Sequence, residues 1–236
     1  MRPEQTLNWM HLGTERLLAE VVVLPDAALS APTALPGWTR AYLLSHIAAN
    51  ADALRNLVHW ARTGEERRMY ASTEAREADI AAGAELPAAE IRARVASSAA
   101  ALAADLDALD AVDGAEDAWA AKIVTAQGLT RTASEIPWMR VREIYIHAID
   151  LDAGTTFADL PPDFLAALLD DVTVRRSTVG GGPALVIAAT DTGGRWDVAG
   201  VGSPVPVTGV LPDLAAYLTG RPAPSLPAAP VLPPWL

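Results

Sequence analysis

The sequence predicts an α+β protein, in which an antiparallel four-helix bundle is followed by a small α+β domain. Three observations support this fold class. The first 150 or so residues read as long helical segments joined by short connections. Beyond about residue 155, short apolar runs alternate with glycine-rich turns, which is typical of short strands. Apolar residues make up 51% of the 236 residues, enough for a sizeable core. We therefore expect two domains, residues 1–154 and residues 155–236.

The expected bundle helices each combine a helical sequence pattern with a recognisable start or end. Thr39 is a favourable N-cap, Pro137 suits a first turn, and Gly64 and Gly154 are expected to end helices. The stretch AWAAKIVTAQGLTRTAS looks irregular, with Gly128 as a turn. The long helices are expected at residues 6–23, 40–64, 88–109 and 136–154, with a short helix at 74–82 capped by Ser72 or Thr73.

The second domain is expected to mix two helices with short strands. The segment PPDFLAALLDDVTVRR predicts a helix that begins at its prolines, and DLAAYLTG predicts another. PALVIAAT, RWDVAG and VPVTGV predict strands. Nine of the 18 prolines lie from residue 204 onward, so the tail RPAPSLPAAPVLPPWL should be extended.

Composition excludes several classes of function. The chain has no cysteine, which excludes disulfides, thiolate metal sites and a cysteine nucleophile, so any thiol chemistry needs a thiol from outside. A net charge of −11 argues against nucleic acid as a partner. The sequence shows neither a membrane-spanning apolar run nor a signal peptide, which predicts a cytoplasmic protein without a membrane partner. We expect a monomer, because two domains of this size can bury their own cores.

Glu143 and His147 in VREIYIHAID form the starting point for a candidate site. Residues four apart on a helix share one face, so both side chains can reach one ion. His46 lies mid-helix between Leu44 and Ile47, where an unpartnered imidazole would be costly. A facing pair of helices would give two histidines and one carboxylate with a fourth position open, which is the pattern of catalytic zinc.

On this pattern alone, Glu143, His147 and His46 could equally be ordinary polar residues that bind no metal. Glu–His pairs at this spacing are commonly surface pairs, and two histidines and a glutamate also arise by chance. His59 follows His46 by 13 residues, roughly 220° around a helix, so it cannot share that face and is interpreted as a partly exposed structural residue. His11 could approach the bundle interior, but nothing near it supports a metal site.

Together these stretches resemble the mycothiol-dependent maleylpyruvate isomerases, members of the DinB-like metal-binding bundle superfamily. The resemblance spans nearly the whole chain and is clearest in LPGWTRAYLLSHIAANADAL, NLVHWARTGEERRMYAS, TAQGLTRTASEIPWMRVREIYIHAIDL and the ending PPWL. It implies a DinB-like bundle that binds zinc through His46, Glu143 and His147, and a C-terminal domain that closes the active site. It further implies that Arg221, in YLTGRPAP, and Arg76, in MYASTEAR, belong to that site.

The resemblance implies cis–trans isomerisation of maleylpyruvate to fumarylpyruvate, a step of gentisate degradation. Rotation about a double bond requires that a nucleophile adds to it and later leaves. The expected nucleophile is a zinc-bound thiolate of a low-molecular-weight thiol, either mycothiol or ergothioneine. Arg221 and Arg76 would bind the carboxylates of the dianionic keto acid, with Asn50 and Gln127 as further polar contacts. Asp150 could orient His147, but we interpret it as a surface residue at the helix end.

Two other functions stay open on the sequence. A thiol S-transferase that joins a small thiol to electrophiles would need the same thiolate activation, so the metal ligands do not discriminate against it. A non-catalytic metal-binding or regulatory module is the alternative from another class.

Overall fold

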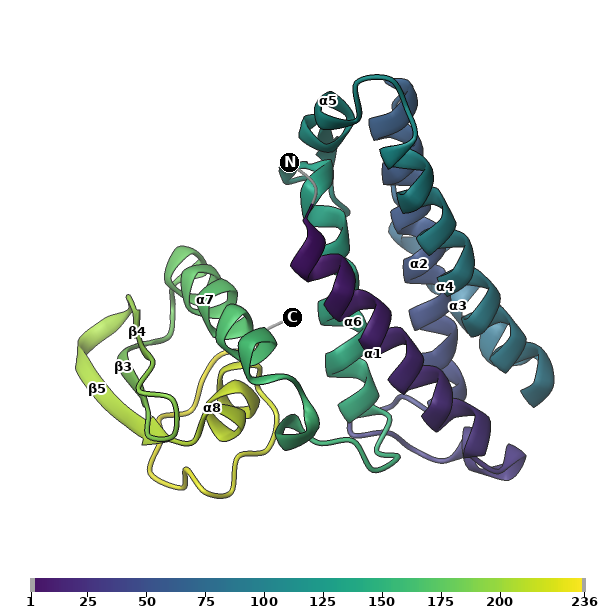
Figure 1. Ribbon diagram of the computed structural model, residues 1–236. Helices are drawn as coiled ribbons and strands as arrows, with labels where there is room; N and C mark the ends of the chain where they lie inside the picture. Colours follow the sequence, from purple (N-terminus) through teal and green to yellow (C-terminus); the bar gives the residue numbers. More distant parts are fainter. Residues whose placement is uncertain (1–2, 235–236) are drawn as a thin grey trace. The chain divides into compact units, whose positions relative to one another are not determined.

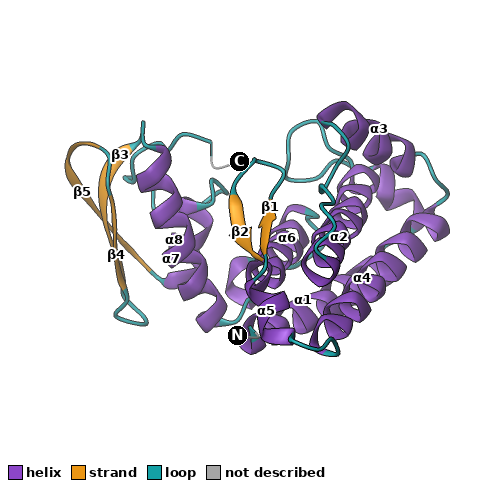
Figure 2. Cartoon of the chain, turned by 90° about the horizontal axis from the view of Figure 1, so that it is seen from above, coloured by secondary structure: helices purple, strands orange, loops and turns teal. Residues whose placement is uncertain are grey.

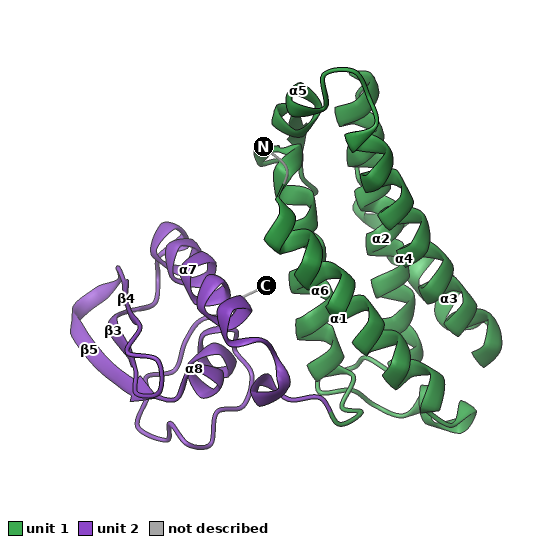
Figure 3. Ribbon diagram, in the orientation of Figure 1, with its two compact units in different colours: residues 1–154 green, residues 155–236 purple. Residues whose placement is uncertain are grey.

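The computed structural model describes residues 3–234, so the last two residues of the PPWL ending lie outside it. The chain divides into two compact units, Met1–Gly154 and Thr155–Leu236 (Figure 3). The first is helical apart from one small hairpin, and the second combines helices with a small sheet (Figure 2). The predicted α+β fold class, with a helical bundle followed by a small sheet domain, is confirmed.

The first unit is built around long helices that run side by side (Figure 1). Helix α2 packs against α4, α6 and the shorter α3, while α1 packs against α6 and α4. Leucine, isoleucine and alanine side chains fill the space between them. The bounds are α1 Glu4–Val23, α2 Arg40–Thr63, α3 Thr73–Ala84, α4 Ala88–Asp110 and α6 Ile136–Asp150.

Local signals set the ends of these helices as expected. The Thr39 hydroxyl accepts a hydrogen bond from the Tyr42 backbone N–H at 3.2 Å at the start of α2. Gly64 follows α2 with a φ of 76°, in the left-handed region where glycine is favoured. Ser72, rather than Thr73, caps α3 by accepting from the Ala75 N–H at 3.0 Å.

Two expectations for the first unit are wrong. The stretch expected to be irregular contains the end of a short helix, α5 (Ala115–Ala120), and an antiparallel hairpin of β1 (Lys122–Val124) and β2 (Thr130–Thr132). Strands of three residues are too short to show an alternating pattern. The Gly128 turn lies where it was expected, with a φ of 74°.

Helix α6 ends at Asp150, not at Gly154. Carbonyl groups at the end of a helix need other donors, and the Asp150 carbonyl accepts from the Ala34 N–H at 2.9 Å. A side chain from α2 binds the two carbonyls that follow the helix. The Arg40 guanidinium donates to the Leu151 carbonyl at 2.8 Å and to the Asp152 carbonyl at 2.6 Å. The residues from Leu151 to Gly154 form turns and bends.

The second unit carries a three-stranded sheet in the order β4-β3-β5. Strand β3 pairs with β4 antiparallel and with β5 parallel. Helix α7 packs on β4 and on α8. Residues 221–234 form neither helix nor strand, as the prolines predict, but the segment contains turns and is not extended throughout. The bounds are α7 Pro162–Val179, β3 Pro183–Ala189, β4 Arg195–Val198, β5 Val201–Gly209 and α8 Leu211–Leu218.

Across residues 3–234, no helix combines the length and the apolar character needed to cross a membrane.

Candidate metal centre

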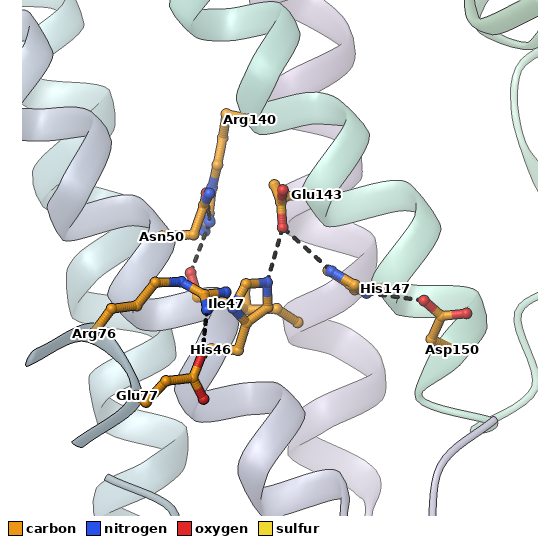
Figure 4. A network of polar contacts seen from close by, with 9 residues as sticks. All are labelled: His46, Ile47, Asn50, Arg76, Glu77, Arg140, Glu143, His147 and Asp150. Atoms are coloured by element: carbon orange, nitrogen blue, oxygen red, sulfur yellow. Dashed lines mark hydrogen bonds and ion pairs between the residues drawn. The ribbon is translucent and has the colours of Figure 1, made fainter. Parts of the chain in front are cut away.

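His46, Glu143 and His147 converge between α2 and α6 (Figure 4). Glu143 Oε2 lies 3.1 Å from His46 Nε2 and 3.2 Å from His147 Nε2. One potential ligand atom from each residue falls within 4.8 Å of the others. The structure thus brings together the three residues that the sequence suggested, although they are up to 101 positions apart along the chain.

A buried arginine ties the two helices together beside this cluster. Arg140 on α6 donates from Nη1 to the Ile47 carbonyl at 2.7 Å and to Asn50 Oδ1 at 2.9 Å, both on α2. Its side chain is fully buried, and burial lowers the pKa of Arg140 to about 10, so it remains cationic at neutral pH. Arg140 therefore fixes how α6 sits on α2 three residues before Glu143.

Asp150 orients His147. Its carboxylate accepts from His147 Nδ1 at 2.9 Å, and the Asp150 side chain is completely buried. The interpretation of Asp150 as a surface residue is therefore wrong. The end of α6 is covered because the segment before α2 packs on it, and the Ala34 N–H donates to the Asp150 carbonyl at 2.9 Å. With Nδ1 holding the proton, His147 Nε2 can offer a lone pair to a metal.

The protonation states of His46 and Glu143 suit the binding of a cation. Burial lowers the pKa of His46, against the opposing effect of Glu143, so its imidazole is neutral at pH 7. Burial favours the neutral form of Glu143, but hydrogen bonds from His147 and His46 hold its pKa well below the usual range. Burial disfavours the charged form of His147, yet Asp150 and Glu143 raise its pKa to about 9. A metal would therefore displace a proton from His147.

The donor set fits a tetrahedral metal ion. Imidazole nitrogen and carboxylate oxygen bind Zn²⁺ at ~2.0–2.2 Å, which places ligand atoms roughly 3.3 Å apart in a tetrahedral site. The two contacts that Glu143 makes, 3.1 and 3.2 Å, are close to this spacing, and all three ligand atoms lie within 4.8 Å of one another. Three protein ligands leave one position for a ligand from outside.

A cavity of about 500 Å³ lies next to the cluster. His46 and Glu143 line it, together with residues from α2, the segment after it, α3, the β1–β2 hairpin and α6. It contains Asn50, Arg76 and Gln127, which the sequence suggested as substrate or thiol contacts. The structure thus places these three side chains beside the metal cluster, and their contacts with a substrate or thiol stay predictions. Asn50 Oδ1 is already held by Arg140.

Arg76 is joined to the cluster directly. Its Nη2 lies 3.2 Å from His46 Nδ1, and its Nη1 donates to Glu77 Oε1 at 2.7 Å. The guanidinium also lies over the Tyr70 ring, 5.6 Å from the ring centroid.

Arg221 lies in the second unit, after α8, where its Nη1 donates to the Thr219 carbonyl at 2.6 Å. Its role at the site stays a prediction.

Sequence reasoning missed several residues of the cavity. Arg68, Arg142 and Tyr70 line it, and Arg140 is buried beside it. In the sequence, the only signs of these arginines were the motif RRMY, which contains Arg68, and the R-x-R spacing of Arg140 and Arg142 just before Glu143. Three cavity arginines give this protein of net charge −11 a local site suited to an anion.

The remaining histidines lie elsewhere. His59 contacts Glu65 at 3.3 Å with a quarter of its side chain exposed, in keeping with a partly exposed structural role. It lines a different cavity of about 580 Å³, which contains none of the three cluster residues. His11 is on an exposed face of α1.

A helical bundle that carries a His–Glu–His cluster next to an arginine-lined cavity has the features of a metal-binding bundle enzyme. The family model described as the mycothiol maleylpyruvate isomerase N-terminal domain matches residues 10–152. The chain therefore belongs to the mycothiol maleylpyruvate isomerase family, and it is an enzyme of the isomerase class.

Solved structures show the same relationship over the full length. The crystal structure of the mycothiol-dependent maleylpyruvate isomerase is 36% identical, with a TM-score of 0.91, and the match covers 100% of this chain and 98% of that one. The crystal structure of a histidine-to-alanine mutant of that enzyme is also 36% identical, with a TM-score of 0.90 and the same coverage. Among curated proteins, none matches the sequence.

Proposed function

We propose that this protein isomerises maleylpyruvate to fumarylpyruvate, using a low-molecular-weight thiol and a zinc ion held by His46, Glu143 and His147. The observation that carries the proposal is the convergence of these three ligand atoms beside a cavity lined by arginines. Membership of the mycothiol maleylpyruvate isomerase family supports the choice of substrate and thiol.

The cluster suits zinc better than a hard cation such as Mg²⁺, because two of its three donors are imidazole nitrogens. Zinc at this site would lower the pKa of a thiol in the fourth position. The chain itself has no cysteine, so the thiol comes from solution. It supplies the nucleophile that adds to the double bond and leaves after rotation about the resulting single bond.

The arginines of the cavity would bind and orient the substrate. Maleylpyruvate carries two carboxylates, and guanidinium groups match carboxylates with two parallel hydrogen bonds. Arg68, Arg76 and Arg142 line the cavity that also contains Glu143. A cation near the keto oxygen would stabilise the negative charge that develops there during addition. The amides of Asn50 and Gln127 are the neutral hydrogen-bonding groups available in the same cavity.

A direct assay tests the proposed function. Loss of maleylpyruvate absorbance is followed with zinc-loaded protein and mycothiol, ergothioneine or glutathione, and without a thiol. We expect turnover with one thiol and essentially none without it, and His46→Ala should remove both bound zinc and turnover. No turnover with any thiol would contradict the proposal. Net consumption of the thiol with an electrophile, without isomerisation, would instead support the S-transferase.

The predicted role of Arg221 has its own test. If Arg221 binds a substrate carboxylate, Arg221→Ala should lower kcat/KM for maleylpyruvate by about 100-fold, the loss of one charge-assisted contact. Arg195 is an exposed arginine of the same unit, so Arg195→Ala is the matched control and should keep normal kcat/KM. Equal kcat/KM for the two variants would exclude Arg221 from the site.

A further inference from the structure

Both ring nitrogens of His46 are in contact with another side chain, and the two contacts determine the position of its proton. Nδ1 faces Arg76 Nη2 at 3.2 Å, and Nε2 faces Glu143 Oε2 at 3.1 Å (Figure 4). A guanidinium only donates hydrogen bonds. His46 Nδ1 must therefore accept from Arg76, and the neutral ring carries its proton on Nε2, where it donates to Glu143.

This arrangement is incompatible with a metal ion on His46 Nε2. Metal binding needs a lone pair on that nitrogen, so a neutral ring must then carry its proton on Nδ1. The Nδ1–H and the Arg76 N–H would both be donors, and they cannot bond to each other. His147 shows the contrast, because its Nδ1 faces the acceptor Asp150 and is already arranged for a metal on Nε2.

We propose that a metal ion and Arg76 compete for His46, so that metal binding releases Arg76 Nη2 to bind a carboxylate in the adjacent cavity. This inference rests on the zinc site of the proposed function and adds a coupling between that site and the anion site. Metal loading and binding of the anionic substrate then favour each other.

Other contacts keep the released guanidinium in place. Arg76 Nη1 remains hydrogen-bonded to Glu77, whose second oxygen accepts from the Tyr42 hydroxyl at 2.9 Å. The Tyr70 ring lies beneath the guanidinium. Because Arg76 lines the cavity that His46 and Glu143 also line, its free N–H groups stay next to the metal site. A small dicarboxylate is the class of ligand that this position would take, since Arg68 and Arg142 line the same cavity.

Thermodynamic linkage requires the two effects to be equal in size. If zinc tightens the binding of a dicarboxylate by some factor, the dicarboxylate must tighten zinc by the same factor. Exchanging one charge-assisted hydrogen bond for another is expected to give a coupling of about tenfold.

The experiment uses the full chain, freed of metal with a chelator, and maleate as an unreactive cis-dicarboxylate in the absence of thiol. Maleate affinity is measured by calorimetry with and without zinc, and zinc affinity by competition with a chromophoric chelator with and without maleate. In the wild type we expect each ligand to tighten the other about tenfold.

Variants of Arg76 separate the proposed competition from other causes of coupling. Arg76→Gln puts an amide oxygen in the position of the guanidinium. The amide oxygen can accept a hydrogen bond from His46 Nδ1–H, whereas a guanidinium cannot accept one. This variant should tighten zinc about tenfold without maleate and abolish the coupling. Arg67→Gln removes an exposed charge that lines the other cavity and not this one, so it should change zinc affinity by less than about twofold and keep the coupling. Circular dichroism verifies that each variant is folded.

The outcomes distinguish this inference from the zinc site on which it rests. If His46→Ala does not weaken zinc binding, the proposed zinc site is wrong and the inference falls with it. If zinc depends on His46 but zinc and maleate bind independently, the competition is overturned while the zinc site stands. Coupling that persists in Arg76→Gln would mean that maleate coordinates the metal directly, and this result would also overturn the proposed competition between the metal and Arg76.

Discussion

Two helices of this protein carry a histidine and a glutamate four residues apart, in opposite order along the chain and in very different surroundings. On α1, His11 and Glu15 lie 3.3 Å apart with 71% and 64% of their side chains exposed. On α6, Glu143 and His147 lie 3.2 Å apart with 26% and 14% exposed. The spacing along the helix is the same, and the two distances are nearly equal. A third ligand from another helix, a buried acceptor behind the histidine and a neighbouring cavity make the second pair a candidate metal centre.

The contrast shows that an i,i+4 pair acquires chemistry from its environment. In water, a pair such as His11–Glu15 contributes little, because solvent screens the charges and both side chains move freely. At α6, burial acts against the charged forms, but hydrogen bonds within the cluster outweigh it, so the pKa of Glu143 is shifted downward and that of His147 upward. These ligands are held in place before any ion arrives, which lowers the cost of binding it.

The strongest test of this contrast exchanges the carboxylate in each pair. Glu143→Gln should weaken zinc binding by about 100-fold or more and abolish turnover, because an amide is a poor zinc ligand. Glu15→Gln is the matched control and should bind zinc normally. Zinc content by atomic emission and affinity by chelator competition are the measurements. Unchanged zinc affinity in Glu143→Gln would mean that the cluster is an ordinary polar network.

A second test removes the charge of the acceptor behind His147. Asp150→Asn keeps the shape of the side chain but weakens the hydrogen bond that orients the ring, so zinc affinity should fall 10- to 100-fold. Asp152→Asn, two residues further along, is the control, since the Asp152 side chain is exposed and asparagine tolerates its φ of 52°. Equal zinc affinities in the two variants would show that the Asp150 carboxylate does not support the site.

The third test concerns the effect of pH on zinc binding, which is the smallest of the three when it is counted per unit of pH. The pKa of His147 in the metal-free protein is raised to about 9, so at lower pH zinc must displace a proton from its imidazole. Zinc affinity should therefore fall about tenfold for each unit of pH below 9 and level off above it. Chelator competition between pH 6.5 and 8.5 measures the slope. A flat profile would contradict the raised pKa of His147.

Much of the fold could be predicted because its signals are local. Thr39, Gly64 and Ser72 set helix ends through contacts within a few residues, and the structure has these ends where they were expected. The β1–β2 hairpin was missed because strands of three residues carry too little pattern. Just past the early end of α6, two carbonyls are bound by Arg40, more than a hundred residues upstream, and no local signal reports such a contact.

The residues of the candidate site also fall into two groups, those that the sequence could predict and those that only the tertiary structure brings together. Glu143 and His147 share a face because a helix returns to the same side every 3.6 residues, so the sequence by itself determined that pair. The absence of cysteine likewise determined that any thiol used in the reaction must come from outside. Tertiary packing alone decided that His46 faces the pair, that Arg140 is buried against α2 and that Asp150 is an inward acceptor and not a surface charge. The physical reason is that burial and partner choice depend on which helix lies opposite, and a periodic pattern reveals a residue's face but not what covers it.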